Sequence, residues 1–202
     1  LWDAMGRKEV YATSGTRMTV RLFGGWDFTA EDAAANDLAA VGYARGVPMG
    51  GTLTKATEDA KAPSFLVAAM KDPLSGNLDR IQIVKGWTDK DNTAHEKIYN
   101  VTWSDPQTRT PDANGALPPV GNTVDVATAS WTNDIGADGL AAVWTDPDFD
   151  PAERAFYYAR AIEIPTPRWT AYDAMRFNIK MPPDVPMTHQ ERAWTSSIWY
   201  TP

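Results

Sequence analysis

Only two histidines, His95 and His189, and no cysteine are available in this chain for metal binding or acid–base chemistry. Metal-dependent hydrolases draw their ligands from several histidines and carboxylates that converge on one ion. The two histidines lie far apart in the sequence, and no soft ligand stands beside either of them. We therefore expect no transition-metal site and no cofactor within this chain, and the lack of cysteine excludes disulfides and thiolate chemistry.

His189 is the stronger functional candidate, because Gln190, Glu191 and Arg192 follow it directly. A short run of donors and acceptors of this kind can bind a polar ligand, with the imidazole as proton donor or acceptor. The alternative is an ordinary surface or hydrogen-bonded histidine with a structural role.

Two arginines stand next to features that favour ligand recognition. Arg17 follows the predicted turn at Thr13–Thr16, and Arg168 precedes Trp169. A guanidinium group can bind a carboxylate or a phosphate through two parallel hydrogen bonds, although pairing with some of the 26 acidic residues explains the same positions. The predicted ligand-binding residues are Arg17, Arg168, Trp169, His189, Glu191 and Arg192.

Other motifs associated with catalysis are incomplete. Asp146, Asp148 and Asp150 alternate as in the first half of a calcium loop, but Pro151 and Tyr157 stand where that loop requires glycine and glutamate. Turn formation explains these aspartates more simply. The chain has no Gly-x-Ser-x-Gly elbow and no phosphate-binding loop ending in Gly-Lys. We assign no catalytic residue and leave open whether the parent protein is an enzyme.

The composition limits the class of protein and its partners. The 202 residues are 43% hydrophobic, which suits one globular domain, and their formal net charge is -7. This acidic balance disfavours nucleic acid and anionic membranes as partners, and no apolar run approaches the roughly 20 residues that span a bilayer. Cysteine usage leaves the compartment open, and we favour a periplasmic or secreted location over a cytoplasmic one.

Short runs of alternating apolar and polar residues dominate the sequence. Such runs predict strands, and turn signals such as Asp72-Pro73 and Asp146-Pro147 separate several of them. Because little helical pattern lies between the runs, we expect a mainly β fold, an antiparallel β-sandwich with a few short helices. The predicted strands cover residues 10–13, 17–23, 65–70, 80–84, 98–103, 124–129, 140–144 and 156–164.

The first nine residues predict an amphipathic helix. They begin without a methionine and carry no capping residue, which suggests the end of a longer helix. The alternative that fits the helix pattern equally well is a trimmed but complete domain. Leu1 and Met5 share one face, since residues four apart are neighbours on a helix. We expect Leu1, Trp2 and Met5 to form an apolar patch that is exposed or buried by self-association.

Two further segments predict short helices. Thr29 and Asp32 resemble a capping box that opens a helix to about Val41, with Gly42 as its C-terminal cap. The same Thr-Asp spacing starts a helix over residues 170–177. The surrounding tail, rich in proline, must either wrap the sandwich or return toward a neighbouring domain.

Tryptophan is frequent, with nine residues in the chain. Trp87, Trp103, Trp131 and Trp144 lie within or next to predicted strands. Packing in the core or on the sheet surface is the favoured interpretation, because aromatic side chains bury large areas. The alternative is a platform on which a sugar stacks.

Several segments in order resemble one bacterial family. They are Arg7–Arg17, Phe23–Trp26, Leu78–Gly86, Ile164–Thr170 and Gln190–Tyr200. Together they resemble the C-terminal half of the family called domain of unknown function 3604, and they span nearly the whole chain. Members of that family resemble the PHP metal-dependent phosphoesterases, in which an N-terminal barrel-like domain carries the His and Asp metal ligands.

This resemblance implies a division of the chain. Residues 1–16 would be the remnant, a helix plus a strand, of a missing N-terminal PHP-like domain, and residues 17–202 would be a β-sandwich domain with a Pro-rich C-terminal tail. Any divalent metal would belong to the missing domain, because its ligand motifs have no counterpart in this sequence. The partner of the chain would then be that domain of the same protein.

Three functions remain open at this point. The first is an accessory C-terminal domain of a PHP-like metal-dependent hydrolase, inactive alone, with the Thr13–Arg17 turn and the tail facing the missing site. A cleft beside the first helix, lined by Arg17, Arg168 or Arg192, would favour it. The second is a carbohydrate- or ligand-binding sandwich that acts through aromatic stacking, which exposed tryptophans would favour. The third is a structural module that forms a homo-oligomer through an apolar face.

Overall fold

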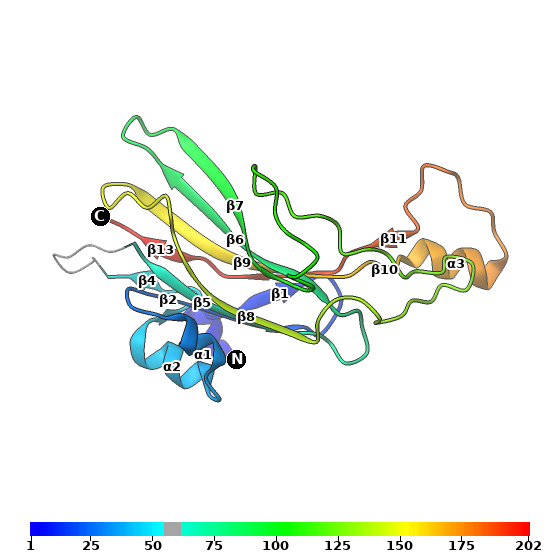
Figure 1. The fold of residues 1–202 in the computed structure, drawn as a ribbon, viewed down its shortest axis with the longest axis horizontal. Coiled ribbons are helices and arrows are strands. Elements are labelled where there is room, and N and C mark those ends of the chain that lie inside the picture. Colours follow the sequence, from blue (N-terminus) through cyan, green and yellow to red (C-terminus); the bar gives the residue numbers. More distant parts are fainter. Residues whose placement is uncertain (55–61) are drawn as a thin grey trace.

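Two β-sheets, antiparallel except for one parallel pair of short strands, pack face to face in the structure, a computed structural model that describes residues 1–54 and 62–202 (Figure 1). The prediction of a mainly β antiparallel sandwich with a few short helices is confirmed. The helical segments are α1 (Trp2–Gly6), the 3₁₀ helix η1 (Ala30–Ala34), α2 (Leu38–Arg45) and α3 (Trp169–Phe177). In the part of the chain that the structure describes, no helix is long and apolar enough to cross a membrane.

The larger sheet has seven strands. They are β1 (Tyr11–Thr13), β4 (Thr52–Leu53), β6 (Leu78–Thr88), β7 (Ala94–Trp103), β9 (Arg154–Glu163), β12 (Arg192–Thr195) and β13 (Ile198–Tyr200). At the centre lies β9, which pairs with β6 along one edge, and β6 continues to β7. The other edge of β9 pairs with β12 and β13, so the end of the chain runs along most of its length. In turn β1 pairs with β12, and β4 pairs with β13.

A bulge separates β12 from β13. Trp194 pairs with Arg160 and Ile198 pairs with Tyr157, so the C-terminal segment carries one residue more than the matching stretch of β9. At this point the Thr195 hydroxyl accepts the backbone N–H of the facing strand, that of residue 159, at 2.9 Å. The side chain thus replaces a missing backbone acceptor and keeps the sheet continuous.

The smaller sheet has four strands in the order β3-β2-β5-β8. Their bounds are Val47–Pro48 for β3, Thr19–Gly25 for β2, Ser64–Met70 for β5 and Gly139–Thr145 for β8. Alternate side chains of both sheets point into the space between them, as the period of two requires. The buried core includes Val20, Leu22, Phe65 and Val67 from the smaller sheet and Ile81, Ile83, Tyr157 and Ile198 from the larger sheet.

The outer face of the smaller sheet is covered by η1 and α2. Phe23 and Leu66 are buried there against Leu38 and Val41. Gly42 lies inside α2 rather than at its end, so its predicted role as a cap is wrong. A Cβ at this position would stand 2.4 Å from the Phe23 ring, so only glycine lets the helix approach the sheet this closely.

The single helix predicted from Thr29 is two helices in the structure. Asp32 accepts the backbone N–H of Thr29 at 2.7 Å, as a capping box requires, but the segment it opens is only η1. The chain is extended at Ala35, and Asp37 then caps α2 by accepting the N–H of Ala40 at 2.9 Å. A second capping residue in the middle of the predicted helix therefore divided it.

The strand predicted at residues 124–129 is also wrong, because this segment forms a turn. The carboxylate of Asp125 accepts the N–H of Ala127 at 2.9 Å and the hydroxyl of Thr128 at 2.8 Å. Ala129 adopts a positive φ of 49°, which a strand does not allow. Local capture of backbone groups by Asp and Thr side chains competes with sheet pairing.

The N-terminal segment is attached to the sandwich, although its helix is exposed. The expected exposure of Leu1, Trp2 and Met5 on α1 is found. Beyond α1, β1 joins the larger sheet, and the carbonyl of Val10 accepts the N–H of Ser196 at 2.9 Å. The apolar helix α1 is therefore exposed to solvent, and β1, which follows it, joins the chain to the larger sheet.

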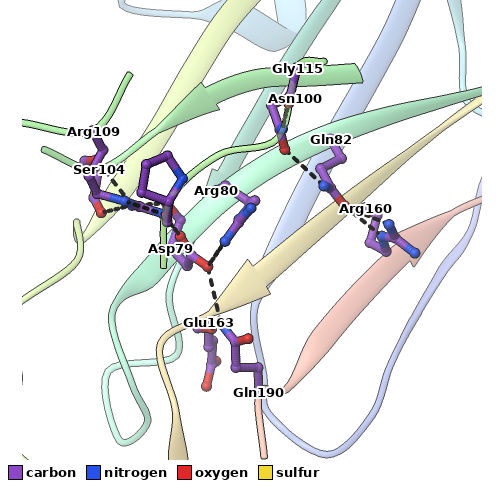
Figure 2. A network of polar contacts seen from close by, with 11 residues as sticks. Asp79, Arg80, Gln82, Asn100, Ser104, Arg109, Gly115, Arg160, Glu163 and Gln190 are labelled. Atoms are coloured by element: carbon purple, nitrogen blue, oxygen red, sulfur yellow. Dashed lines mark hydrogen bonds and ion pairs between the residues drawn. The ribbon is translucent and has the colours of Figure 1, made fainter. Parts of the chain in front are cut away.

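A buried carboxylate, that of Asp79, joins three distant parts of the chain. Its Oδ1 accepts a hydrogen bond from Arg109 Nη2 at 2.6 Å, and its Oδ2 accepts from Arg80 Nε at 3.0 Å (Figure 2). Gln190 Nε2 donates to the same Oδ2 at 3.1 Å. This carboxylate is therefore compensated by two guanidinium groups and an amide, as a buried charge must be.

Arg109 in turn holds the long connection between β7 and β8, residues 104–138. This stretch contains no strand in the structure, so its backbone has few partners in the sheets. The guanidinium group donates to the carbonyl oxygens of Pro118 at 3.0 Å and of Ser104 at 3.2 Å. The buried guanidinium group of Arg109 therefore holds the long connection at two points, Ser104 and Pro118.

Replacing Arg109 with alanine should destabilise the fold by about 3–5 kcal/mol, because the Asp79 carboxylate would stay buried with half of its compensation. Urea unfolding followed by circular dichroism measures the change. Arg21→Ala, at an exposed position on a strand, serves as the control and should change stability by no more than about 0.5 kcal/mol. Equal effects of the two substitutions would contradict a structural role for the Asp79 network.

Candidate functional site

The turn after β1 meets the C-terminal tail in a polar cluster, which we call the turn–tail junction. It consists of Ser14, Thr16, Glu163, His189 and Glu191. The Ser14 hydroxyl donates to Glu191 Oε2, and Glu191 Oε1 lies 3.1 Å from His189 Nε2. The structure therefore brings together His189 and Glu191, two of the residues that the sequence predicts to bind ligand.

Arg17 and Arg192 border this junction through their backbones. The N–H of Arg192 donates to Ser14 Oγ at 2.9 Å, and the N–H of Ser14 donates to the carbonyl of Arg192 at the same distance. The N–H of Arg17 donates to Asp72 Oδ2 at 2.8 Å. Both arginines are exposed, and neither forms an ion pair with a residue that the structure describes.

The hydrogen bonds of the junction do not build a nucleophile. In a Ser-His-Asp triad, the imidazole accepts the serine proton and the carboxylate orients the imidazole. Here the hydroxyl of Ser14 donates to the carboxylate of Glu191, which stands between the serine and His189. The arrangement suits hydrogen bonding to a polar group and differs from a triad, because the serine hydroxyl meets the carboxylate of Glu191 and not the imidazole of His189.

Glu163 is the buried member of the junction. Its side chain is inaccessible to solvent, and Ser75 Oγ donates to its Oε2 at 2.6 Å. Burial raises the pKa of Glu163, and the negative charges of Glu191 and Asp72 act in the same direction. Its Oε1 and the hydroxyl of Thr16 are buried atoms without a hydrogen-bond partner among residues 1–54 and 62–202.

Arg168 and Trp169 lie apart from the junction, at the start of α3. A short ribbon of β10 (Thr166–Pro167) and β11 (Thr188–His189) connects the two regions. The Arg168 guanidinium carbon lies 5.8 Å from the centre of the Trp169 ring, so the two side chains interact with each other. Trp169 is 61% exposed. The predicted start of a helix here is correct, but Arg168 occupies the N-cap position.

Two of the three alternating aspartates after β8 pair with lysines, and the third, Asp150, accepts the backbone N–H of Ala152 at 2.8 Å. Asp146 is buried, with its Oδ2 2.7 Å from Lys85 Nζ and 2.8 Å from the hydroxyl oxygen of Tyr157. Asp148 accepts from Tyr99 at 2.6 Å and lies beside Lys97, and this lysine lowers the pKa of Asp148. In the described residues, no three His, Asp or Glu side chains are grouped so that they could hold a metal ion.

A groove of about 1050 Å³ crosses the larger sheet near the turn between β6 and β7. Gly86, Glu96, Arg154, Phe156 and Trp199 line it, and we call it the aromatic groove. Gly86 pairs directly with both Glu96 and Phe156, and Phe156 pairs with Trp199. Because directly paired residues share a face of a sheet, these side chains stand together on the face opposite the core. None of the predicted site residues lines this groove.

Trp87, one of the tryptophans for which the sequence left a sugar-stacking platform open as the alternative, also lines this groove. The four tryptophans considered, Trp87, Trp103, Trp131 and Trp144, are all partly buried, as the packing interpretation expects, and Trp87 and Trp144 contact the core. Trp199 is 48% exposed instead. The signal that could have located the groove is the alternation in β9, where Phe156 and Tyr158 interleave with the core residues of the opposite face.

Comparison with known proteins gives one match. The family described as "Protein of unknown function (DUF3604)" matches residues 1–202, the full length of the chain. No curated protein matches the chain. No solved structure matches it either.

The raised pKa of Glu163 predicts the sign of a pH effect on stability. The stability that protonated Glu163 contributes is complete below its unfolded pKa and is lost as the pH rises through its folded pKa. Glu163→Gln keeps a neutral side chain of the same shape. As the pH rises above the unfolded pKa of a glutamate, this variant should therefore gain stability relative to the wild type, as measured by urea unfolding at several pH values.

Asp72→Asn serves as the control with the opposite sign. The backbone N–H groups of Leu74 and Arg17 lower the pKa of Asp72. The stability that ionised Asp72 contributes is present above its unfolded pKa and is lost as the pH falls through its folded pKa. The asparagine variant should therefore lose stability relative to the wild type as the pH rises. Parallel pH profiles for the two variants would contradict the burial argument for Glu163.

Proposed function

The chain belongs to the DUF3604 family, and we propose that it serves there as the accessory β-sandwich domain of a PHP-like metal-dependent hydrolase, without catalytic activity of its own. The single observation that carries this proposal is an uncovered apolar surface on the N-terminal segment. Leu1, Trp2 and Met5 are 98%, 85% and 56% exposed, and Tyr11 on β1 is 40% exposed.

The same segment also contains a sheet edge. One edge of β1 pairs with β12, and in residues 1–54 and 62–202 no strand pairs with its other edge. Exposed sheet edges and exposed apolar patches both favour contact with another surface. A domain attached to the same chain meets such a surface at high effective concentration, which makes it the favoured partner.

The turn–tail junction continues this surface with polar groups. The turn that follows β1 carries Ser14 and Arg17, and Ser14 is bonded to Glu191. A domain seated on α1 and the edge of β1 would therefore lie next to exposed Arg17 and the His189–Glu191 pair. We propose that these side chains bind the neighbouring domain or a ligand held there, while the metal and its ligands belong to that domain.

The division of labour predicts different metal contents for two proteins. After dialysis, the 202-residue chain should retain far less than one equivalent of zinc, iron or manganese and should not hydrolyse an aryl phosphate. The longer protein that includes the neighbouring domain should retain about one or more equivalents of metal and should hydrolyse the aryl phosphate. Metal analysis by mass spectrometry and a nitrophenyl phosphate assay measure this. Stoichiometric metal in the chain, with turnover that His189→Ala abolishes, would show that the chain is itself the catalytic domain.

Hydrogen exchange provides a separate test of the contact surface. If the neighbouring domain covers α1 and β1, the amides of residues 2–13 should exchange at least about tenfold more slowly in the longer protein than in the chain. The amides of α3, at the other end of the molecule (Figure 1), provide an internal control and should exchange equally in both. Unchanged exchange at residues 2–13 would exclude this surface as the domain contact.

A further inference from the structure

The aromatic groove carries an inference that does not depend on the proposed function. We propose that it binds a neutral oligosaccharide, with a sugar ring stacked against Phe156 and Trp199. The groove lies on the larger sheet, where β6, β7, β9 and β13 run side by side near the C-terminal end of the chain (Figure 1). Its volume of about 1050 Å³ is at the upper end of the range for ligand sites.

The rings that line the groove are held at an angle to each other. The centres of the Phe156 and Trp199 rings are 5.2 Å apart and their planes are tilted by 46°. Tyr158 extends the row beyond Phe156, at 6.5 Å and nearly parallel. The face of an aromatic ring is electrically negative. The C–H groups on one face of a sugar ring are slightly positive, so they are attracted to the aromatic face. Two tilted rings can therefore contact a sugar from the side and from below.

Gly86 creates the floor on which this arrangement depends. A Cβ at position 86 would lie 2.3 Å from the Phe156 ring, so the ring occupies the space where a side chain would stand. Any larger residue would push Phe156 away from the sheet and into the groove. The glycine thus both lowers the floor and sets the orientation of one stacking ring.

The polar rim carries charges of both signs. Glu96 and Arg154 line the groove and are exposed, and neither forms an ion pair within the described residues. Asp89 and Lys90 stand at the turn end. A carboxylate accepts hydrogen bonds from sugar hydroxyls and a guanidinium group donates to them, so the pair matches a ligand rich in hydroxyls. A phosphate or nucleotide would instead require a concentration of positive charge.

Isothermal titration calorimetry of the 202-residue chain tests the inference. The probes are neutral hexasaccharides of β-1,4-linked glucose, β-1,3-linked glucose and β-1,4-linked xylose, with a hexasaccharide of galacturonate as the acidic comparison. At least one neutral probe should bind with a Kd below about 1 mM. Binding of the acidic probe alone, or no binding by any probe at about 10 mM, would overturn the proposal.

Matched variants locate the binding. Trp199→Ala should weaken the affinity for the bound probe about tenfold, because a stacking ring is lost. Phe177→Ala removes an exposed aromatic ring outside the groove and should leave the affinity unchanged. Gly86→Ala should also weaken binding, since it displaces Phe156. Circular dichroism checks that each variant is folded, and wild-type affinity in Trp199→Ala would falsify the assignment of the groove.

Discussion

The rest of the structure depends on one buried charge, the carboxylate of Asp79 on β6. A carboxylate at zero exposure is unfavourable unless every oxygen is compensated, and here Arg109, Arg80 and Gln190 share that task. Each of them comes from a different segment, so the requirement of one side chain positions the long connection and the tail. The turn–tail junction follows from this placement, because Gln190 lies directly between His189 and Glu191.

A second polar ladder begins on the outer face of the same sheet. Arg160 donates to Gln82, Gln82 to Asn100, and Asn100 to the carbonyl of Gly115 (Figure 2). This ladder covers the middle of the face with amides and a guanidinium group and reaches the long connection. Toward the β6–β7 turn the same face presents the aromatic rings of Phe156 and Trp199. One half of this face is thus covered by hydrogen-bonded polar side chains, and the other half forms the aromatic groove.

The alternating pattern of the sequence predicted most of the strands, because a period of two is a local property. It failed where local side chains compete with the sheet, as with Asp125, and where a second cap interrupts a helix, as with Asp37. The junction between His189 and Ser14 could not be predicted, since it depends on pairing of β1 with β12. The shape of the groove could not be predicted for a similar reason, because the space that Gly86 leaves for the Phe156 ring depends on the pairing of β6 with β9.

The pairing of β1 with β12 joins residues 11–13 to residues 193–195, nearly the full length of the chain. Strand pairs of such high sequence separation form slowly, because a long loop must close before any contact repays the lost entropy. During synthesis on the ribosome, β1 has no partner until residues 193–195 have emerged. The strand β1 is therefore exposed to chaperones, or to aggregation, until β12 has been made, whereas the edge of β9 that later pairs with β12 and β13 is exposed for a much shorter time.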